Sequence, residues 1–346
     1  MARIAIGNTG LFAEDTGFGA LPIQRIPKAD AVKLLRMAFD AGITYYDTAR
    51  AYTDSEEKLG EAFPAGDREK IIIATKVWHF TEEGFWDDLH TSLKMLRTDY
   101  IDIYQFHNPS FCPKPEDGSG MYEAMLKAKE QGKIRHIAIT NHRMHVAQEA
   151  VNSGLYTVLQ FPFNYLSTDK EIQLVKDTLN AKMGFACMKG MSGGLIESGA
   201  AATVWMRRYP GVMPIWGVQR EEELKEFISY INDPPKETEE IRRTIETDRD
   251  QLKGDFCRSC GYCMPCPQGI QIPTAARMSL LLRRAPTAGN LSERGQAMMA
   301  KIDDCIECGQ CASKCPYGLD TPALLKRNLK DYREVLAGKP ILPHNY

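Results

Sequence analysis

The sequence predicts an α/β fold, in which a (β/α)₈ TIM barrel over residues 1–235 is followed by a small, mostly helical domain. Three observations lead to this prediction. Short β-branched or aromatic runs alternate with amphipathic segments along the first 235 residues. Polar residues recur where these runs end. After residue 235 the alternation stops, and helical patterns surround two tight groups of cysteines.

The expected strands are short and regularly spaced. They lie near 17–21 and at 44–49, 70–77, 100–108, 134–141, 157–164, 184–189 and 213–218. Between them lie helical patterns such as 28–42, 55–63, 84–97, 121–133 and 221–231, several of which end in Gly, as helix C-termini often do. Eight strand–helix units indicate a parallel sheet with crossover helices. Closing that sheet gives a barrel, which typically takes about 250 residues.

A doubly wound open sheet is the structural alternative. It is less favoured because no G-x-G-x-x-G follows the first strand. An open sheet also concentrates its polar strand ends at one switch point. A barrel instead collects them in one ring at the C-terminal ends of its strands, where active sites of this fold lie.

Composition excludes several functional classes. The 346 residues are 43% hydrophobic and 25% charged, with a formal net charge of −2. This balance is typical of a globular protein and gives no field that would attract nucleic acid or an anionic membrane. The sequence contains neither the apolar run of a signal peptide nor the roughly 20 apolar residues of a membrane span. We therefore expect a soluble, cytoplasmic protein with no nucleic-acid or membrane partner.

The polar strand ends are the candidate site. In chain order they are Asp47, Lys76, His107, Thr140–Asn141, Gln160–Asn164, Lys189 and Gln219–Arg220. Each one alone is most simply a solvated or hydrogen-bonded loop residue. Their convergence on one face of a barrel makes a shared catalytic role the stronger interpretation.

Four stretches of this region resemble the aldo-keto reductases. They are YYDTARAYTDSEEKLG (45–60), IIIATKV (71–77), YIDIYQFH (100–107) and AITN (138–141). The resemblance covers nearly all of the first 230 residues. It implies NADPH-dependent carbonyl reduction by a catalytic tetrad, which in this sequence is Asp47, Tyr52, Lys76 and His107.

Each member of the implied tetrad has a chemical reason. Hydride delivery to a carbonyl carbon leaves an alkoxide, which must be protonated as it forms. Tyr52 is the expected acid. A tyrosine hydroxyl has a pKa of about 10 in water, and an adjacent ammonium group lowers such a value. Lys76 would supply that ammonium, held by Asp47, and His107 would hydrogen-bond the substrate oxygen.

The same resemblance implies the cofactor contacts. Thr140, Asn141 and Gln160 match residues that bind the nicotinamide carboxamide. The loops 190–195 and 217–221 flank the usual phosphate site of a barrel, where a helix N-terminus favours anions. The cofactor candidates in this part of the chain are Met188, Lys189, Gly193, Gly217, Gln219 and Arg220. Met188 stands where the family often places an aromatic residue, and Arg220 is a candidate for the 2′-phosphate.

The implied cofactor is thus NADP(H), with NAD(H) as the alternative, and the substrate is a small aldehyde, ketone or alcohol. Its identity is not readable from the sequence. Trp78, His79, Phe80, Phe111 and Cys112 lie in loops that would form an apolar lip, or would simply pack against neighbouring helices.

The ten cysteines are unevenly distributed. Cys112 and Cys187 stand alone, whereas the others form two groups, within 257–266 and 305–315. Cysteines two residues apart rarely bridge one another, so metal binding is favoured over disulfides. The stretch CIECGQCASKCPYG (305–318) has the C-x₂-C-x₂-C-x₃-C-P spacing of bacterial 4Fe-4S ferredoxins. Zinc is the competing interpretation, since C-x₂-C pairs also bind zinc.

By analogy with two-cluster ferredoxins, the last cysteine of each group should bind the other cluster. This predicts one cluster on Cys257, Cys260, Cys263 and Cys315, and a second on Cys305, Cys308, Cys311 and Cys266. The first group has two residues, not three, before Cys266, which departs from the pattern. Helical patterns at 273–285 and 292–302 lie between the groups. The region resembles the helical dicluster modules that some aldo-keto reductase relatives carry. A helical linker is expected at 236–254 and the ferredoxin-like domain at 255–346.

Two functional hypotheses follow. The first is an NADP(H)-dependent oxidoreductase that interconverts an aldehyde or ketone with an alcohol. The second is an electron-transfer or redox-sensing protein whose barrel binds nicotinamide nucleotide without efficient turnover. In either case the clusters would exchange electrons, through an unseen flavin or a redox partner protein, or would serve structure, sensing or docking. The sequence contains no flavin fingerprint that would split a hydride into single electrons.

Overall fold

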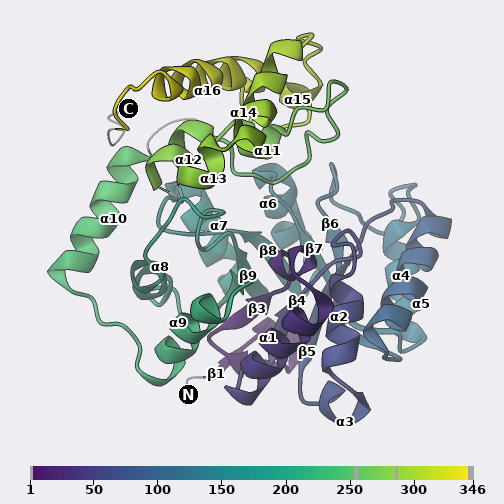
Figure 1. Ribbon diagram of the computed structural model, residues 1–346. Helices are drawn as coiled ribbons and strands as arrows, with labels where there is room; N and C mark the ends of the chain where they lie inside the picture. Colours follow the sequence, from purple (N-terminus) through teal and green to yellow (C-terminus); the bar gives the residue numbers. More distant parts are fainter. Residues whose placement is uncertain (1–2, 253–255, 285–286, 342–346) are drawn as a thin grey trace. The chain divides into compact units, whose positions relative to one another are not determined.

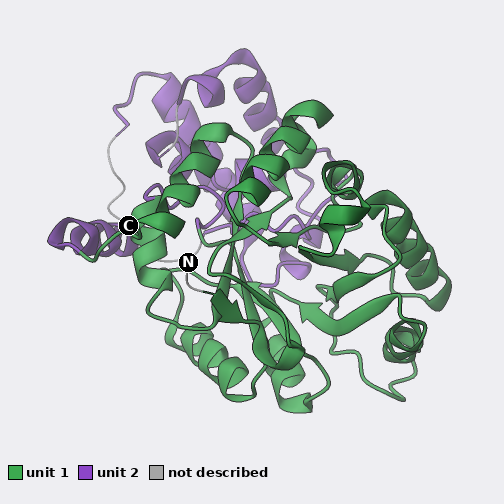
Figure 2. Ribbon diagram, turned by 90° about the horizontal axis from the view of Figure 1, so that it is seen from below, with its two compact units in different colours: residues 1–190, 199–237 green, residues 191–198, 238–346 purple. Residues whose placement is uncertain are grey.

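The computed structural model describes residues 3–252, 256–284 and 287–341 (Figure 1). The chain divides into two compact units (Figure 2). The first, here called the barrel unit, comprises 1–190 and 199–237. The second, here called the cysteine unit, comprises 191–198 and 238–346. The sequence-based domain bounds at 235 and 254 remain predictions. Residues 253–254, at the end of the expected linker, and residue 255, at the start of the expected ferredoxin-like domain, lie outside the described residues.

The barrel unit contains eight parallel strands in the closed order β10-β3-β4-β5-β6-β7-β8-β9. Their bounds are β3 Gly17–Gly19, β4 Tyr45–Asp47, β5 Ile72–Val77, β6 Ile101–His107, β7 Ile134–Thr140, β8 Val158–Pro162, β9 Gly184–Met188 and β10 Val212–Gly217. The predicted barrel is confirmed, and the open-sheet alternative is wrong. Parallel register aligns the strand ends: Lys76 pairs with Gln105, His107 with Thr140, and Thr140 with Gln160.

Helices follow the strands and surround the barrel (Figure 1). They are α1 Lys28–Asp40, α2 Ser55–Ala62, α3 Ala65–Arg68, α4 Glu82–Leu96, α5 Met121–Glu130, α6 Met144–Ser153, α7 Asp169–Asn180, α8 Gly199–Met206 and α9 Glu221–Asn232. The apolar stripe of α1, at Ala31, Leu34, Leu35 and Ala38, is buried. The helix α7 begins with a capping box between Thr168 and Glu171. Amphipathic periodicity and local capping thus position the helices.

A short antiparallel pair, β1 Arg3–Ala5 and β2 Phe12–Glu14, precedes the barrel and was not expected from the sequence. Ile6 and Ala13 are buried in one cluster with inward-facing strand residues such as Tyr45 and Ile103. The turn after Ile6 lies against β9, because a Cβ at Gly7 would come within 2.2 Å of the Gly184 nitrogen. The pair therefore helps to fill the barrel interior away from the strand ends that carry the predicted site.

The cysteine unit is mostly helical, as predicted. Its helices are α10 Glu239–Gln251, α11 Ile272–Ala275, α12 Met278–Arg284, α13 Thr287–Leu291, α14 Glu293–Ala300, α15 Gln310–Ser313 and α16 Thr321–Leu336. Its core includes Ile270, Met278, Met299, Leu325 and Tyr332, and six of the cysteines pack against that core. Residue 285, the last of one expected helical segment, lies outside the described residues.

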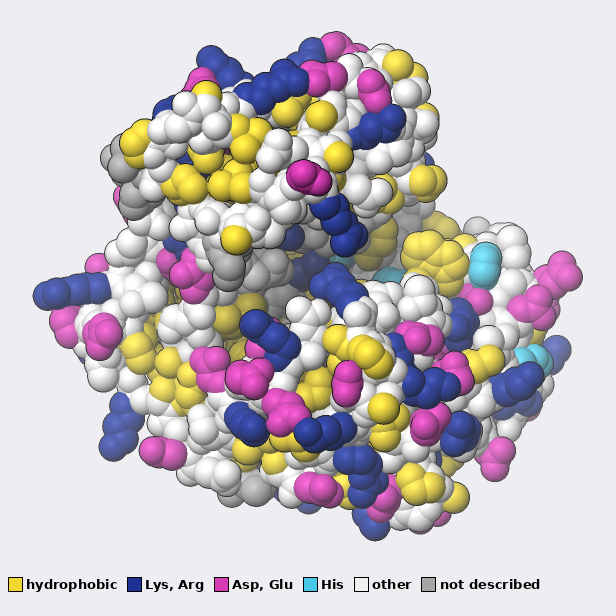
Figure 3. Space-filling view, viewed as in Figure 1, with side chains coloured by type: hydrophobic (Ala, Val, Ile, Leu, Met, Phe, Trp, Pro, Cys, Tyr) yellow, Lys and Arg dark blue, Asp and Glu magenta, His cyan; other side chains and the backbone are white. Residues whose placement is uncertain are grey.

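The surface carries charges of both signs. On the face shown in Figure 3, basic and acidic side chains are interspersed, consistent with the net charge of −2. Within the described ranges, no helix combines the length and apolarity needed to cross a membrane.

Candidate functional site

The centre of the barrel site is a buried ion pair between Asp47 and Lys76. Asp47 ends β4 and Lys76 lies near the end of β5, so adjacent strands hold both. The Lys76 Nζ lies 2.8 and 2.9 Å from the two Asp47 carboxylate oxygens and donates to the Thr48 carbonyl at 2.6 Å. Gln105 and Gln160 complete the carboxylate shell, with Nε2 donating at 3.4 and 3.3 Å.

Burial sets the electrostatics of this pair. It raises the pKa of the Asp47 carboxyl and lowers the pKa of the Lys76 ammonium, because each charge has left water. The opposite charge and the hydrogen bonds between them counter both shifts. Either group alone would therefore be a costly buried charge.

Tyr52 and His107 lie beside the ion pair. The Lys76 Nζ is 5.2 Å from the Tyr52 ring centroid. The Tyr52 and His107 ring centroids are 5.9 Å apart and nearly perpendicular, at 83°. The Trp78 and His107 ring centroids are 5.5 Å apart. The structure thus brings all four residues of the predicted tetrad together, with an exposed aromatic residue at their edge.

The imidazole of His107 is neutral in this environment. Burial, and then the Lys76 charge, lowers the pKa of His107 to about 3. Its Nδ1 is buried and has no hydrogen-bond partner among the described residues. Buried polar atoms normally have partners, so an orphan nitrogen here is suited to a bound molecule.

Sequence reasoning missed the residues that support this tetrad. Glu56 is completely buried; it accepts from the Thr75 and Ser92 hydroxyls at 2.6 and 2.8 Å and is ion-paired with Arg50. Arg50 also donates to the Thr53 carbonyl at 3.1 Å, so the pair clamps the loop that carries Tyr52. A signal existed, since Glu56 lies inside the quoted 45–60 motif. Gln105 could also have been found, because it stands two residues before His107 and so shares its strand face.

The implied nicotinamide contacts are partly assembled. The Thr140 hydroxyl lies 3.8 Å from the Met188 sulfur. The Gln160 Oε1 is buried and has no partner in the described part of the chain, which fits a carboxamide donor. The Asn141 side chain is already engaged: its Nδ2 donates to the Pro109 carbonyl at 2.9 Å and its Oδ1 accepts from the Arg143 nitrogen at 2.7 Å. Three of these four residues therefore face a common region at the ends of β7, β8 and β9.

The remaining cofactor candidates lie in two loops. The Lys189 carbonyl accepts from Asn164 Nδ2 at 2.9 Å, and Lys189 has a positive φ of 63°. Gly193 belongs to the cysteine unit. Gly217 is exposed at the end of β10, close to the Pro22 ring. Lys189 thus follows β9 directly, and Gly217 is the last residue of β10.

Gln219 and Arg220 precede α9, and both are hydrogen-bonded to the carboxylate of Glu223. The Glu223 carboxylate accepts from the Gln219 and Arg220 nitrogens at 3.0 and 3.2 Å, and its other oxygen from the Arg220 guanidinium at 2.7 Å. The Arg220 side chain is otherwise exposed. A cofactor phosphate here would therefore compete with Glu223 for the same donors.

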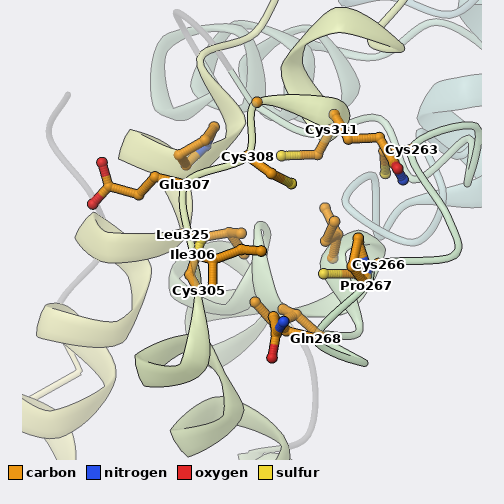
Figure 4. Close-up of a pocket in the computed structure, with 15 residues that line it drawn as sticks. Cys263, Cys266, Pro267, Gln268, Cys305, Ile306, Glu307, Cys308, Cys311 and Leu325 are labelled. Atoms are coloured by element: carbon orange, nitrogen blue, oxygen red, sulfur yellow. The ribbon is translucent and has the colours of Figure 1, made fainter.

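The cysteine groups meet at one cavity. Cys263, Cys266, Cys305, Cys308 and Cys311 line it, and Figure 4 shows their side chains around a common space. Four of these five are the residues predicted for one cluster. Burial, and then the thiols of Cys257 and Cys260, raises the pKa of Cys263 to about 12, so the first group is also close-set. Thiolates are the ligands that iron–sulfur clusters require, so these side chains have the right chemistry. Within the described residues, no three or more His, Cys, Asp or Glu side chains are grouped closely enough to hold a single metal ion, so the ligation of a cluster stays a prediction.

The other cysteines differ in their surroundings. Cys257, Cys260 and Cys315 do not line the cavity. Their assignment to a second cluster with Cys263 stays a prediction. Cys112 and Cys187 are buried in the barrel unit, where the Cys187 thiol donates to the Phe163 carbonyl at 2.9 Å.

Residues 4–203 match the aldo/keto reductase family, and residues 256–320 match the 4Fe-4S dicluster domain. The first match spans more than half of the chain. The protein belongs to the aldo/keto reductase family and carries a C-terminal 4Fe-4S dicluster domain.

Individual curated relatives match the chain at moderate identity and over only part of their length. The chain is 37% identical over 150 residues to L-galactose dehydrogenase of Arabidopsis thaliana, covering 39% of this chain and 47% of the relative. It is 31% identical over 220 residues to the aldo-keto reductase YhdN of Bacillus subtilis, covering 57% and 66%. The match thus spans about half to two thirds of these relatives.

Solved structures share the fold. An aldo-keto reductase from Klebsiella pneumoniae in complex with NADPH superimposes with a TM-score of 0.61 at 21% identity, covering 72% of this chain and 96% of that one. An aldo-keto reductase of Pseudomonas, PA4992, gives 0.59 at 23% identity, covering 68% and 95%.

Proposed function

We propose that the protein is an NADP(H)-dependent oxidoreductase that interconverts a small aldehyde or ketone with its alcohol. One observation carries the proposal: the Lys76 ammonium is held between the Asp47 carboxylate and the Tyr52 ring, with the neutral His107 beside them. This arrangement supplies a proton donor, a charge that stabilises its conjugate base, and a hydrogen-bond donor for a carbonyl oxygen.

The roles follow from the geometry. The nicotinamide, when bound, supplies the hydride. The Tyr52 hydroxyl donates its proton to the substrate oxygen as negative charge develops there. The Lys76 ammonium stabilises the phenolate left on Tyr52, and the Asp47 carboxylate keeps Lys76 charged and oriented. A neutral imidazole carries one N–H, with which His107 orients the carbonyl without itself losing a proton.

The cofactor assignment rests on the ends of β7 to β10. The unpartnered Gln160 Oε1 suits the amide of a nicotinamide carboxamide, and Thr140 and Met188 border it. Arg220 is the proposed partner of the 2′-phosphate, in exchange for Glu223. NAD(H) would bind without displacing Glu223, so a comparison of both nicotinamides is part of the test.

Two 4Fe-4S clusters are proposed in the cysteine unit. Cys266, Cys305, Cys308 and Cys311 would hold one, and Cys257, Cys260, Cys263 and Cys315 the other. The ligation of the first is supported by the shared cavity. Cys308 is exposed, which would favour electron exchange with a redox partner protein over a purely structural role. Anaerobic purification should give a brown protein with about eight irons per chain, and a colourless zinc protein would overturn the assignment.

The experiment that tests the reductase proposal is anaerobic NADPH and NADH oxidation with a panel of small aldehydes and ketones. Tyr52→Phe should lower kcat by roughly 10²- to 10⁴-fold, the usual contribution of a general acid. Tyr122→Phe is the matched control, because its hydroxyl donates to the Leu155 carbonyl in another part of the barrel. Unchanged turnover in Tyr52→Phe would overturn the proposal.

The alternative, nucleotide binding without turnover, predicts a different outcome. The wild-type protein would then bind NADPH and reduce none of the carbonyl compounds. Electron paramagnetic resonance of the same samples would show whether NADPH reduces the clusters.

A further inference from the structure

The loop between β5 and α4 brings an exposed aromatic ring to the edge of the tetrad. Trp78 and His79, two residues of the predicted apolar lip, directly follow β5, the strand that carries Lys76. The Trp78 side chain is 45% exposed. Its ring centroid lies 5.5 Å from that of His107, and the two rings are inclined at 68°. The loop thus presents an apolar surface next to the residue proposed to orient the carbonyl.

One carboxylate holds the backbone of this loop. Asp88 Oδ2 accepts from the backbone nitrogens of Trp78 and His79, each at 2.8 Å. The other oxygen, Oδ1, lies 3.1 Å from His79 Nδ1. Asp88 lies on α4 and is buried. Hydrogen bonds to an ionised acceptor are stronger than those between neutral groups, so this contact fixes the chain where it leaves β5.

The beginning of α4 packs against the same loop. The Thr81 hydroxyl caps the helix by accepting from the Gly84 nitrogen at 3.2 Å. A Cβ at Gly84 would lie 2.5 Å from the His79 Cβ, so His79 lies directly against the first turn of the helix. The Phe80 and Phe106 rings are 6.3 Å apart, which joins the loop to β6 as well. The residues around Trp78 are therefore attached to both a helix and a strand of the barrel unit.

The proposed proton-transfer chemistry does not use the Asp88 carboxylate. A buried charge is costly unless it is well partnered. Here its partners are the two residues on which the position of the Trp78 ring depends. A side chain that is fixed before the substrate arrives needs no ordering on binding, which removes an entropic cost. The contact is thus suited to keeping an aromatic surface in place beside the tetrad.

We propose that Asp88 is a positioning residue for the carbonyl substrate and acts through Trp78. The substrate class is an aldehyde or ketone that carries an aromatic ring. The ring packs on Trp78, and the carbonyl group is directed to Tyr52 and His107. Aromatic pairs of this kind are stabilised beyond the burial of their apolar area. This inference rests on the proposed reductase function and adds a substrate class to it.

The test compares phenylacetaldehyde with acetaldehyde, which differ by one aromatic ring. Anaerobic NADPH oxidation by the full-length protein gives kcat/KM for each, and the quantity compared is their ratio. The wild-type ratio should be at least about 10, within the range that one apolar pocket supplies. Trp78→Ala should lower the ratio roughly 10-fold. Asp88→Ala should lower it at least about threefold by raising the KM for phenylacetaldehyde, with kcat within about twofold of wild type.

A double variant separates positioning from a general structural role. In the Trp78→Ala background, Asp88→Ala should change the ratio less than about 1.5-fold, because two residues that act through one contact are not additive. Amide hydrogen exchange over 78–81 should speed up in Asp88→Ala, which reports the loop without reference to activity. If Asp88→Ala does not fold, Asp88→Ser decides by the same criteria.

Two controls accompany these variants. Asp88→Asn keeps an oxygen that can accept from both backbone nitrogens, so it should retain the wild-type ratio within about twofold. Asp87→Ala removes the exposed neighbouring acid of the same helix and should leave the ratio and the exchange over 78–81 unchanged.

The failures are distinguishable. A wild-type protein that reduces carbonyl compounds of the panel without preferring phenylacetaldehyde overturns the inference while the proposed function stands. An unchanged ratio in Asp88→Ala, or an effect that persists in full without the Trp78 ring, overturns it as well. A wild-type protein that reduces no carbonyl compound of the panel with either nicotinamide overturns both.

Discussion

The two candidate sites differ in how their functional groups are held. In the barrel unit, Asp47, Lys76 and His107 lie at strand ends, are buried, and are positioned by neighbouring strands. In the cysteine unit the thiols lie largely on loops between short helices, and Cys308 is exposed. The ion pair of the first site is held by the strands of the barrel unit. The second converges on a cavity whose thiols would need an inorganic group to become fixed ligands.

A buried ion pair and a set of metal-binding thiols are held in place by different forces. A buried ion pair is favourable only if both partners are present, so folding of the barrel unit selects the geometry of Asp47 and Lys76. Free thiols gain little from one another, so the cysteine unit relies on its small hydrophobic core and on ligand bonds.

The largest expected effect comes from Lys76→Met. Turnover should fall roughly 10²- to 10⁴-fold because the phenolate of Tyr52 loses its stabilising charge. Stability should fall by about 3–5 kcal/mol, because Asp47 is left as an unpaired buried carboxylate. Urea unfolding of the barrel unit measures the second effect, and adding Asp47→Leu should restore stability but not activity. Loss of iron in Lys76→Met would contradict the independence of the two sites.

Iron removal should destabilise the cysteine unit and leave the barrel unit folded. Treating the protein anaerobically with a chelator and a reductant should increase hydrogen exchange in α14 and α16 while the barrel strands stay protected. The measurement is exchange mass spectrometry of the protein before and after treatment. If α16 keeps its protection without iron, the cysteine unit folds on its core alone and the contrast is broken.

A smaller effect is expected when only one of the two proposed clusters loses a ligand. Cys266→Ser should cost about half of the iron, since one of two clusters loses a ligand. Cys112→Ser, at a buried cysteine of the barrel unit, is the control and should keep all iron. Iron retention in Cys266→Ser would mean that Cys263, which lines the same cavity, has taken its place.

Periodicity predicted the fold well because the barrel is built from local signals. Strand runs and capped amphipathic helices are encoded within about fifteen residues of each other, and the strand ends follow from them. The pair β1–β2 was not predicted, because each of its two strands has only three residues and shows no alternating pattern.

The residues of the site could be predicted where they lie within a sequence motif. They were harder to predict where tertiary packing determines which residues become neighbours. The tetrad lies in quoted motifs, whereas the use of Gln105 and Gln160 around Asp47 depends on which strands become neighbours. Arg220 was singled out by its position before a helix, but its ion pair with Glu223 depends on how that helix begins. Asp88 gave no sequence signal, because its partners include the backbone nitrogens of Trp78 and His79, which any residue at those positions would supply.

The smallest effect concerns pH. His107 has a pKa of about 3 in the folded protein, against an ordinary value of 6.5. Between these values the unfolded chain binds a proton that the folded chain does not, so stability is lost as pH falls below about 6.5. His107→Gln should remove part of this loss, as measured by urea unfolding at pH 7 and pH 5, whereas His145→Gln, at an exposed histidine, should not. A wild-type pH dependence identical to that of His107→Gln would mean that folding does not lower the pKa of His107, and the imidazole would then be largely protonated in the folded protein at pH 5.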